Sequence, residues 1–190
     1  MASIFMSFIH EEETAASTLS FFIRHIFGHS IDTFMSSDKN AIYAGEDWMK
    51  RIFDELKTTK VLISLLSPAS VGRPWINFEA GAAWMGNAVV IPVCMGGLTI
   101  GELPKPYSSL QAIEIGTTEG AYYLFSSIAH HLGIEPPRRP IFSDTPMSSW
   151  TDAQKDENRK LCNTYRVFTT FLKTNLEKTS PKSTQAHEGG

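Results

Sequence analysis

The stretch VLISLLSPASVGRPWINFEAGAA (Val61–Ala83) contains the clearest strand of the chain and a well-marked helix start. Its first six residues are apolar almost throughout, as is typical of a parallel strand that is covered on both faces. Pro68 ends this strand. Pro74 suits the first turn of a helix, so the pattern predicts that a helix begins there. A strand, a loop and a helix in this order indicate an α/β unit.

Similar units are found on both sides of this stretch. Short apolar segments predict four further strands, at residues 3–9, 30–35, 88–93 and 112–115. Three other helices are predicted, over residues 11–27, around Trp48, Ile52 and Leu56, and around Leu124, Ile128 and Leu132, with an end at Gly133. This alternation favours right-handed crossovers and a five-stranded parallel sheet with helices on both faces.

The chain is long enough for one principal core, since it has 190 residues of which 42% are hydrophobic. We place that domain at residues 3–133. A polar linker is predicted for residues 134–151, a helix for residues 152–178, and a disordered tail for residues 179–190.

The predicted C-terminal helix carries one apolar stripe. Its members are Leu161, Tyr165, Phe168, Leu172 and Leu176. The stripe fits two interpretations, since it can pack back on the same domain or contact a second copy or another protein. The spacing does not decide between them.

Composition narrows the class of protein. The net charge is −3, from 17 basic and 20 acidic side chains, and no basic block is present, so we expect no direct nucleic-acid binding. Cys94 and Cys162 are far apart and fit a reducing compartment. The first predicted strand starts at Ser3, which leaves no room for a signal peptide, and the apolar runs are shorter than the ~20 residues of a membrane helix. We therefore expect a cytoplasmic protein without a membrane segment.

In a parallel α/β sheet, ligands bind beyond the carboxyl ends of the strands. The residues at these positions are Ser7 to His10, Ser36 to Asp38, Trp75, Glu79, Cys94, Gly96 and Gly97. No glycine-rich phosphate motif and no nucleophile elbow are present. His130 and His131 adjoin each other at a helix end, which favours a dipole contact over a metal site.

Glu79 follows Trp75 by four residues, so the two side chains share one helical face. We expect Phe78 and Ala82 on the adjacent, core-facing side. From this pattern alone, Glu79 is interpreted as an ordinary exposed helix glutamate.

Four segments in order carry a family resemblance: IFMSFIHEEE (4–13), DTFMSSDKNAIYAGEDWMKRIFDEL (32–56), the opening stretch, and VVIPV (89–93). Together they resemble a bacterial Toll/interleukin-1 receptor (TIR) domain over residues 3–133. The most specific piece is LLSP followed by W-x-x-x-E, from Trp75 to Glu79. The resemblance implies a flavodoxin-like five-stranded sheet.

The resemblance also implies an activity. Many bacterial TIR domains cleave NAD⁺ at the nicotinamide–ribose bond, and Glu79 matches their catalytic glutamate. Phe8, His10, Asp38 and Trp75 match positions that line the substrate pocket.

Residues 38–47 are similar to the loop through which family members associate. Ile42, Gly45 and Trp48 are the self-association residues that we carry over. The expected partners are NAD⁺ as substrate, further copies of the chain, and a sensor or effector protein. Neither a metal nor a cofactor is expected.

A lone carboxylate suits this chemistry. Hydrolysis of an ordinary glycoside needs two carboxyl groups, because the leaving alkoxide must be protonated. Nicotinamide leaves as a neutral pyridine, so one glutamate near the ribose is enough to oppose the developing positive charge.

The main hypothesis is an NAD⁺ glycohydrolase or cyclase that acts in bacterial anti-phage defence after self-association. A non-catalytic TIR interaction module and another nucleotide N-glycosidase are the alternatives.

Overall fold

The computed structural model describes residues 2–28, 31–36, 47–141 and 150–179. At its centre lies a parallel five-stranded sheet in the order β2-β1-β3-β4-β5. The strands are β1 (Ala2–Ser7), β2 (Ile31–Met35), β3 (Val61–Leu66), β4 (Val89–Cys94) and β5 (Ile113–Glu114). The predicted α/β fold is confirmed.

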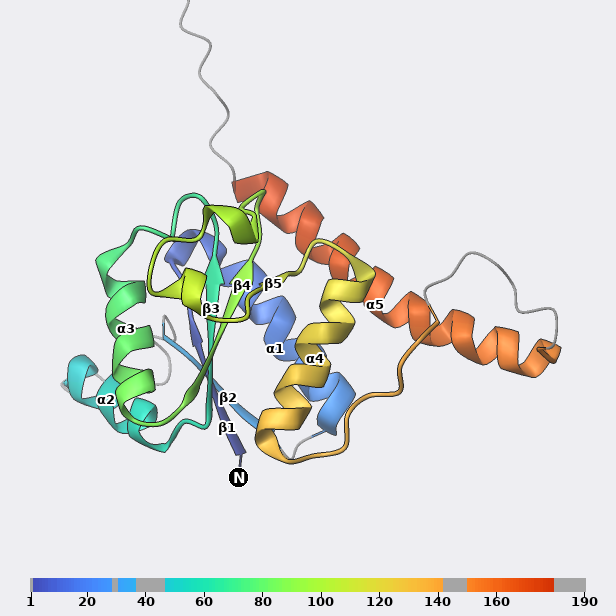
Figure 1. Ribbon diagram of the computed structural model, residues 1–190, viewed down its shortest axis with the longest axis horizontal. Helices are drawn as coiled ribbons and strands as arrows, with labels where there is room; N and C mark the ends of the chain where they lie inside the picture. The colour runs from blue at the N-terminus through green and yellow to red at the C-terminus, as the bar shows by residue number, and fades with distance from the viewer. Residues whose placement is uncertain (1, 29–30, 37–46, 142–149, 180–190) are drawn as a thin grey trace, which may run out of the picture.

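Helices cover both faces of this sheet (Figure 1). Helices α1 (Glu13–Phe27) and α4 (Thr118–Leu132) lie on one face, and α2 (Trp48–Thr58) and α3 (Pro74–Met85) lie on the other. The described residues also include the short 3₁₀ turns η1 (His10–Glu12), η4 (Ile100–Glu102) and η5 (Tyr107–Ser109).

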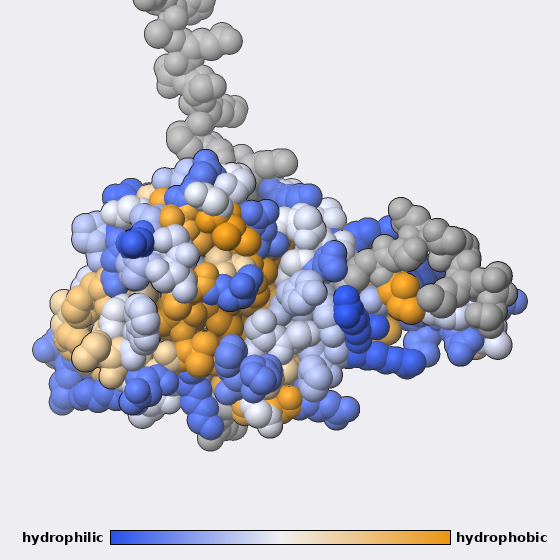
Figure 2. Space-filling view, in the orientation of Figure 1, coloured by the Kyte–Doolittle hydropathy of each residue, from blue (hydrophilic) through white to orange (hydrophobic). Residues whose placement is uncertain are grey.

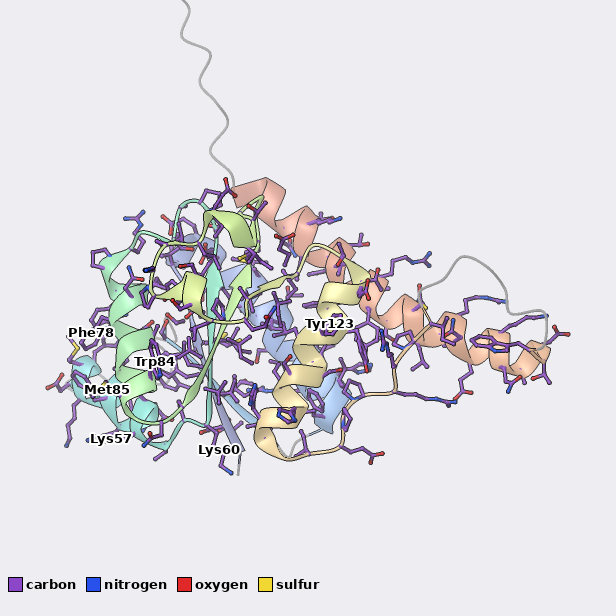
Figure 3. The ribbon with its side chains drawn as sticks, in the orientation of Figure 1. Lys57, Lys60, Phe78, Trp84, Met85 and Tyr123 are labelled. Carbon is purple, nitrogen blue, oxygen red and sulfur yellow. The ribbon has the colours of Figure 1, made fainter. Side chains whose placement is uncertain are left out.

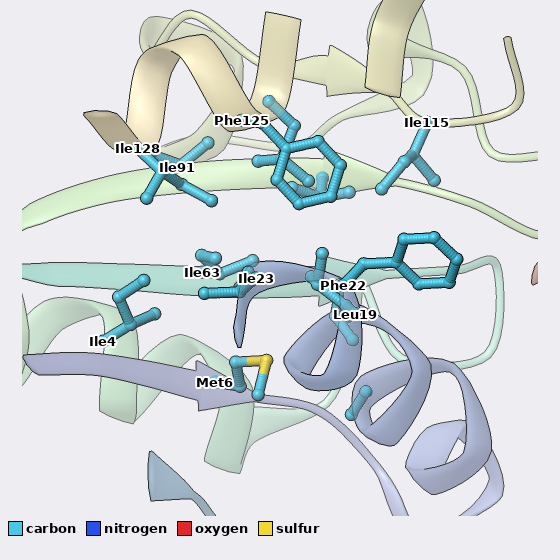
Figure 4. Packing of buried hydrophobic residues seen from close by; sticks show 14 of the residues in the cluster. Ile4, Met6, Leu19, Phe22, Ile23, Ile63, Ile91, Ile115, Phe125 and Ile128 are labelled. Atoms are coloured by element: carbon cyan, nitrogen blue, oxygen red, sulfur yellow. The ribbon is translucent and has the colours of Figure 1, made fainter. Parts of the chain in front are cut away.

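The alternation of side chains along each strand divides the interior into two cores. Ile4 and Met6 of β1 pack toward α1 and α4, in the core drawn in Figure 4. Phe5, between them, packs toward α2 and α3. β3 is buried along its whole length, which explains why its sequence is apolar almost throughout.

The helix boundaries follow the local signals in the sequence. Pro74 is the first residue of α3, as predicted. The Asp47 side chain accepts hydrogen bonds from the amides of Met49 and Lys50 and so caps α2. Gly133, with φ +68°, ends α4 in the left-handed conformation, where glycine carries no steric penalty.

The first strand ends two residues earlier than predicted. Ile9 begins a tight turn, in which the Glu12 amide donates to the Ile9 carbonyl at 2.8 Å. The Glu12 carboxylate in turn accepts from the Ile9 amide at 3.2 Å. This local turn replaces the last strand positions, which an apolar run alone does not predict.

The short β5 leaves part of β4 uncovered at the sheet edge. Only Val93 and Cys94 of β4 pair with β5. Beside the remainder of β4 lies a hollow of about 630 Å³, which is bounded by residues 89–91, residues 110–114 and α4. Figure 2 shows hydrophobic residues gathered here, between α3 and α4.

The C-terminal helix α5 (Asp152–Thr179) lies across α1 and α4, and its N-terminal half extends beyond them (Figure 1). Tyr165, Phe168 and Leu172 are buried. The Phe168 ring centroid lies 4.9 Å from that of Phe22 and 5.3 Å from that of Phe125. Of the two interpretations of the apolar stripe, the structure shows packing on the same domain. The side chain of Leu176 lies outside the described residues.

None of the helices within the described ranges combines the length and the hydropathy that a membrane span needs.

The packing of α5 gives a first prediction. Phe168→Ala empties a fully buried ring position and is expected to lower the free energy of unfolding by about 3–5 kcal/mol. Phe171→Ala is the matched control, because Phe171 lies three residues further along the same helix and is 55% exposed. Urea unfolding followed by circular dichroism measures both. Equal, small losses in the two variants would contradict the docking of α5 on the domain.

Candidate functional site

Glu79 lies on the inner side of α3 and is 0% exposed. It shares this side with Ile76, Ala80 and Ala83, whereas Phe78 is 42% exposed. The interpretation of Glu79 as an exposed residue, and of Phe78 as core-facing, is therefore wrong. Apolar and small residues occur all around α3, so its sequence pattern does not identify the buried face.

Each carboxylate oxygen of Glu79 has its own hydrogen-bond donor. The hydroxyl of Ser7, the last residue of β1, donates to Oε2. The indole Nε1 of Trp75, one turn earlier on α3, donates to Oε1 at 2.8 Å. The predicted pairing of Trp75 and Glu79 on one helical face is confirmed, and it joins α3 to the end of the central strand β1.

Burial dominates the electrostatics of this carboxyl group. The removal of water raises the pKa of Glu79 to about 7, although the hydrogen bonds from Ser7 and Trp75 oppose the rise. At neutral pH the group is thus divided between its two protonation states. A carboxyl group with this property can act as a charged group or as a proton carrier near neutral pH.

Tyr107 of η5 encloses the site from a third direction. Its hydroxyl is buried and donates to the backbone carbonyl of Ile76 in α3 at 3.3 Å. Burial raises the pKa of Tyr107, and the negative charge of Glu79 raises it further. Ser64 of β3, which is the register partner of Ser7, lies close enough to Tyr107 to lower that pKa.

An aromatic ladder connects this buried site to the surface. It consists of Trp48 and Phe53 from α2 and Trp75 and Phe78 from α3. The Trp75 ring is stacked between Trp48, at 4.9 Å, and Phe78, at 5.2 Å. Phe53 meets Phe78 edge-on at 5.7 Å. Figure 3 labels Phe78 on α3, with Trp84 and Met85 further along the same helix.

The site lies where the order of strands reverses. From β1 the chain crosses to β2 on one side, and β3 lies on the other side of β1. Ser7, at the carboxyl end of β1, is next to Ser64 on β3. This is the position at which open parallel sheets bind ligands.

A second buried carboxyl group, Glu12, lies near the same end of β1. Burial raises its pKa, while the hydroxyls of Ser67 and Ser70 and the Ile9 amide lower it. Ser67 and Ser70 belong to the turn that follows β3, so Glu12 connects η1 to the loop that leads into α3.

The remaining predicted site residues lie in other places. Phe8 is 3% exposed and packs in the core on the α1 and α4 side, away from Glu79. His10 is exposed, and its Nδ1 is 3.2 Å from the Glu13 carboxylate. Among the described residues, no contact joins either of them to Glu79. Their substrate-binding roles stay predictions.

Three predicted residues, Asp38, Ile42 and Gly45, lie outside the described residues. Trp48, predicted for self-association, is 40% exposed and stacks on Trp75, so the structure brings these two tryptophans together.

Cys94, Gly96 and Gly97 line a separate hollow of about 570 Å³ at the ends of β4 and β5. Thr169 and Lys173 of α5 form its opposite wall. Cys94 is buried and its pKa is raised to about 11, chiefly by burial, so at neutral pH its thiol is not ionised.

Within the described ranges, no group of three or more His, Cys, Asp or Glu side chains has the arrangement of a metal site.

Several residues of the site region, among them Tyr107 and Glu12, were not predicted from the sequence. Tyr107 lies in a Gly- and Pro-rich loop that gives no periodic signal. Glu12 is one of three consecutive glutamates at a helix start, a pattern that suits exposed acids at a helix N-terminus. No local feature distinguishes Glu12 from its neighbours.

Comparison with known proteins identifies the family of this domain. A family model described as "TIR domain" matches residues 4–122. A stimulator of interferon genes protein from Magallana gigas is 32% identical over 76 residues, which are 37% of this chain and 18% of that protein. The chain thus spans less than a fifth of the length of this curated relative.

Three solved structures are similar at low identity. A metazoan TIR-STING receptor from C. gigas is 21% identical with a TM-score of 0.49, over 70% of this chain and 40% of that one. The TIR domains of the activated Roq1 resistosome are 11% identical with a TM-score of 0.42, over 94% of this chain and 99% of that one. A 2-desoxiribosyltransferase from Leishmania mexicana is 17% identical with a TM-score of 0.40, over 50% of this chain and 65% of that one.

The burial of Glu79 predicts a pH-dependent cost in stability. Below about pH 4.5 the carboxyl group is protonated in both the folded and the unfolded chain, and its raised pKa costs nothing. As the pH rises toward 7, the unfolded chain ionises first and stability is lost. A pKa of about 7 corresponds to a loss of about 3 kcal/mol at pH 8.

Glu79→Gln removes this cost and keeps the shape of the side chain. We expect a higher Tm than the wild type at pH 8 and a similar Tm at pH 4. Glu135→Gln makes the same change at an exposed position and should match the wild type at both pH values. If Glu79→Gln followed the wild type across the whole pH range, Glu79 would have to be solvated.

Proposed function

The chain belongs to the TIR domain family, and from this premise we propose that it is an NAD⁺ glycohydrolase that cleaves the nicotinamide–ribose bond through Glu79. The observation that carries the proposal is the environment of Glu79. This carboxyl group is fully buried, and among the described residues each of its oxygens has one donor and no basic side chain shifts its pKa. Its pKa of about 7 places the ionisation of this group near neutral pH.

The proposed reaction uses the carboxylate form. As the bond between the ribose C1′ and the pyridine nitrogen breaks, its electron pair goes to the nitrogen, and neutral nicotinamide leaves. Positive charge develops on the ribose ring and is opposed by Glu79. Because the surroundings are of low dielectric, this stabilisation is stronger than it would be in water.

The ribosyl cation is then captured by a nucleophile. Attack by water, with loss of a proton to solvent, gives ADP-ribose. Attack by a ring nitrogen of the substrate's own adenine gives a cyclic isomer. NAD⁺ is the substrate in both cases, and no metal takes part.

Access to Glu79 requires a side-chain movement. Trp75 is the half-buried partner of the carboxylate, and its ring belongs to the aromatic ladder that reaches the surface. Movement of Trp75 would release Oε1 toward the ribose hydroxyls and present an aromatic face to a substrate ring.

We assign activation to self-association, because the ladder extends to exposed aromatic side chains on α2 and α3. A neighbouring copy that contacted Trp48 or Phe78 would act on Trp75 directly. A role in defence, with a separate sensor or effector protein as partner, follows from the family resemblance. Cytoplasmic location is part of the same proposal.

A non-catalytic interaction module is the second candidate function. It is favoured by the exposed apolar side chains of α2 and α3, namely Trp48, Met49, Phe53, Phe78, Trp84 and Met85. Patches of this kind mark interaction surfaces on soluble proteins. In such a module, Glu79 would only fix Trp75 and join α3 to β1.

The two candidates differ in the behaviour of Glu79→Gln toward NAD⁺. If Glu79 is catalytic, this variant is expected to lose at least 100-fold in nicotinamide release, as is usual when a preorganised electrostatic group is removed (on the order of 10²–10³). Chromatography of nicotinamide after incubation with NAD⁺ measures the loss. The rate of the wild type should rise with pH with a midpoint of about 7, following the ionisation of Glu79.

Glu135→Gln serves as the control and should retain the wild-type rate. Unchanged turnover in Glu79→Gln would refute the catalytic assignment. Absence of release from the wild type at every protein concentration, with or without a crowding agent, would favour the interaction module.

Activation by self-association predicts a dependence on protein concentration. The rate of nicotinamide release is expected to rise faster than linearly as the protein concentration increases, because a larger fraction of the chain is assembled. Specific activity over a 100-fold range of concentration, with light scattering on the same samples, tests this. A constant specific activity would argue against assembly as the trigger.

A further inference from the structure

We propose that Ser7 is a positioning residue, which anchors Oε2 of Glu79 from the sheet while Trp75 releases Oε1 to the substrate. This inference rests on the proposed function, because it assigns separate roles to the two donors of the same carboxylate. It also predicts an effect on Glu79 that is measurable without any enzymatic activity.

The two donors differ in their ability to move. Ser7 is 0% exposed and belongs to β1, which is hydrogen-bonded to β2 on one side and to β3 on the other. Its hydroxyl is therefore fixed by the centre of the sheet. Trp75 lies in the first turn of α3, is only partly buried, and is stacked on the exposed Trp48.

The position of Ser7 in β1 directs its side chain toward Glu79. Phe5, two residues earlier, packs among the side chains of α2 and α3, and Ser7 points to the same face because strand side chains alternate. An apolar side chain at position 7 would leave Oε2 of Glu79 buried without a hydrogen-bond donor, which is costly for a carboxylate. The serine hydroxyl provides that donor in the smallest possible volume.

The other polar groups around the carboxylate do not take over this role. Ser64 of β3 is fully buried, but its hydroxyl has no hydrogen-bond partner of normal geometry among the described residues. Tyr107 of η5 is a titratable group close enough to be affected by the charge of Glu79, and its hydroxyl donates to the backbone carbonyl of Ile76. Ser7 is thus the donor that the sheet supplies to Glu79, and Trp75 is the donor that α3 supplies.

Loss of the Ser7 hydroxyl has two consequences. The ionised form of Glu79 loses a hydrogen bond, so its ionisation shifts to higher pH. The carboxylate also loses its fixed orientation, which lowers the rate of the chemical step rather than the affinity for substrate.

The test is a double-mutant cycle with pH as the variable. The Tm is measured from pH 4 to pH 9 for the wild type, Ser7→Ala, Glu79→Gln and the double variant. In the wild-type background, the Tm advantage of Glu79→Gln should develop up to about pH 7. In the Ser7→Ala background, the pH at which this Tm advantage stops increasing should be about one pH unit higher. A shift of this size is expected for the loss of a hydrogen bond to a charged group. Ser7→Cys, which keeps a weak donor, should give an intermediate shift.

Kinetics with NAD⁺ form the second readout. Ser7→Ala is expected to lower kcat about tenfold at pH 7, with KM nearly unchanged, and to move the midpoint of the pH–rate profile upward by the same amount as the stability curve. Ser20→Ala is the matched control, because it removes a buried, hydrogen-bonded hydroxyl from α1 on the other face of the sheet and should shift neither profile.

The possible outcomes distinguish the positioning role of Ser7 from the proposed NAD⁺ glycohydrolase function. If Ser7→Ala lowered the Tm equally at every pH, with additive effects in the cycle, Ser7 would be a packing residue and the inference would be wrong. A pH shift in the cycle without nicotinamide release from any variant would support the anchoring of Glu79 by Ser7 and reject the proposed function. A pH shift together with the loss of kcat would support both.

Discussion

The carboxyl group of Glu79 lies in the core between α3 and the central strands, and no cationic side chain among the described residues pairs with it. Burial of a carboxylate is unfavourable, and here the opposing interactions are two neutral hydrogen-bond donors, Ser7 and Trp75. The donors belong to different elements, so the carboxylate can be satisfied only when α3 packs against the end of β1. The position of α3, the stacking of Trp75 and the enclosure by Tyr107 all depend on this arrangement. It joins the region where the strand order reverses to an exposed aromatic surface.

The elements of the fold were largely predictable, because their signals are local. The apolar run of β3, the proline that starts α3 and the glycine that ends α4 each act within a few residues. The end of β1 was not predictable in the same way, since Ile9 and Glu12 form a turn that competes with strand pairing.

The candidate site was predictable only in part. The spacing of Trp75 and Glu79 correctly gave their shared helical face, and the family resemblance pointed to Glu79. The burial of Glu79 could not be derived from α3 alone, because the helix is apolar on nearly every side and the buried face is decided by what packs against it. Ser7 was recognised as a strand-end candidate, but its bond to Glu79 joins residues that are distant in the sequence.

The two faces of the sheet differ in the kind of side chains that pack on them. The face that carries α1 and α4 is sealed by α5, which lies outside the residues matched by the family model. Phe168 enters a cluster with Phe22 and Phe125, so this side is stabilised by apolar packing. The opposite face holds Glu79 and its donor Ser7, and its helices α2 and α3 keep aromatic side chains exposed. Any partner-dependent change is therefore most directly transmitted to Glu79 through α2 and α3, where the aromatic ladder already contacts it through Trp75.

A purely structural role does not require a carboxylate at position 79. The carbonyl oxygen of a glutamine could accept from Trp75, and its amide could donate to the Ser7 hydroxyl, which is able to accept as well as donate. Such a side chain would join α3 to β1 without the cost of ionisation in the core. Glutamate is thus less favourable for stability at neutral pH, and natural proteins retain costs of this kind mainly at functional sites. The negative charge is the property that glutamine lacks, and an oxocarbenium-like transition state is the species that would use it.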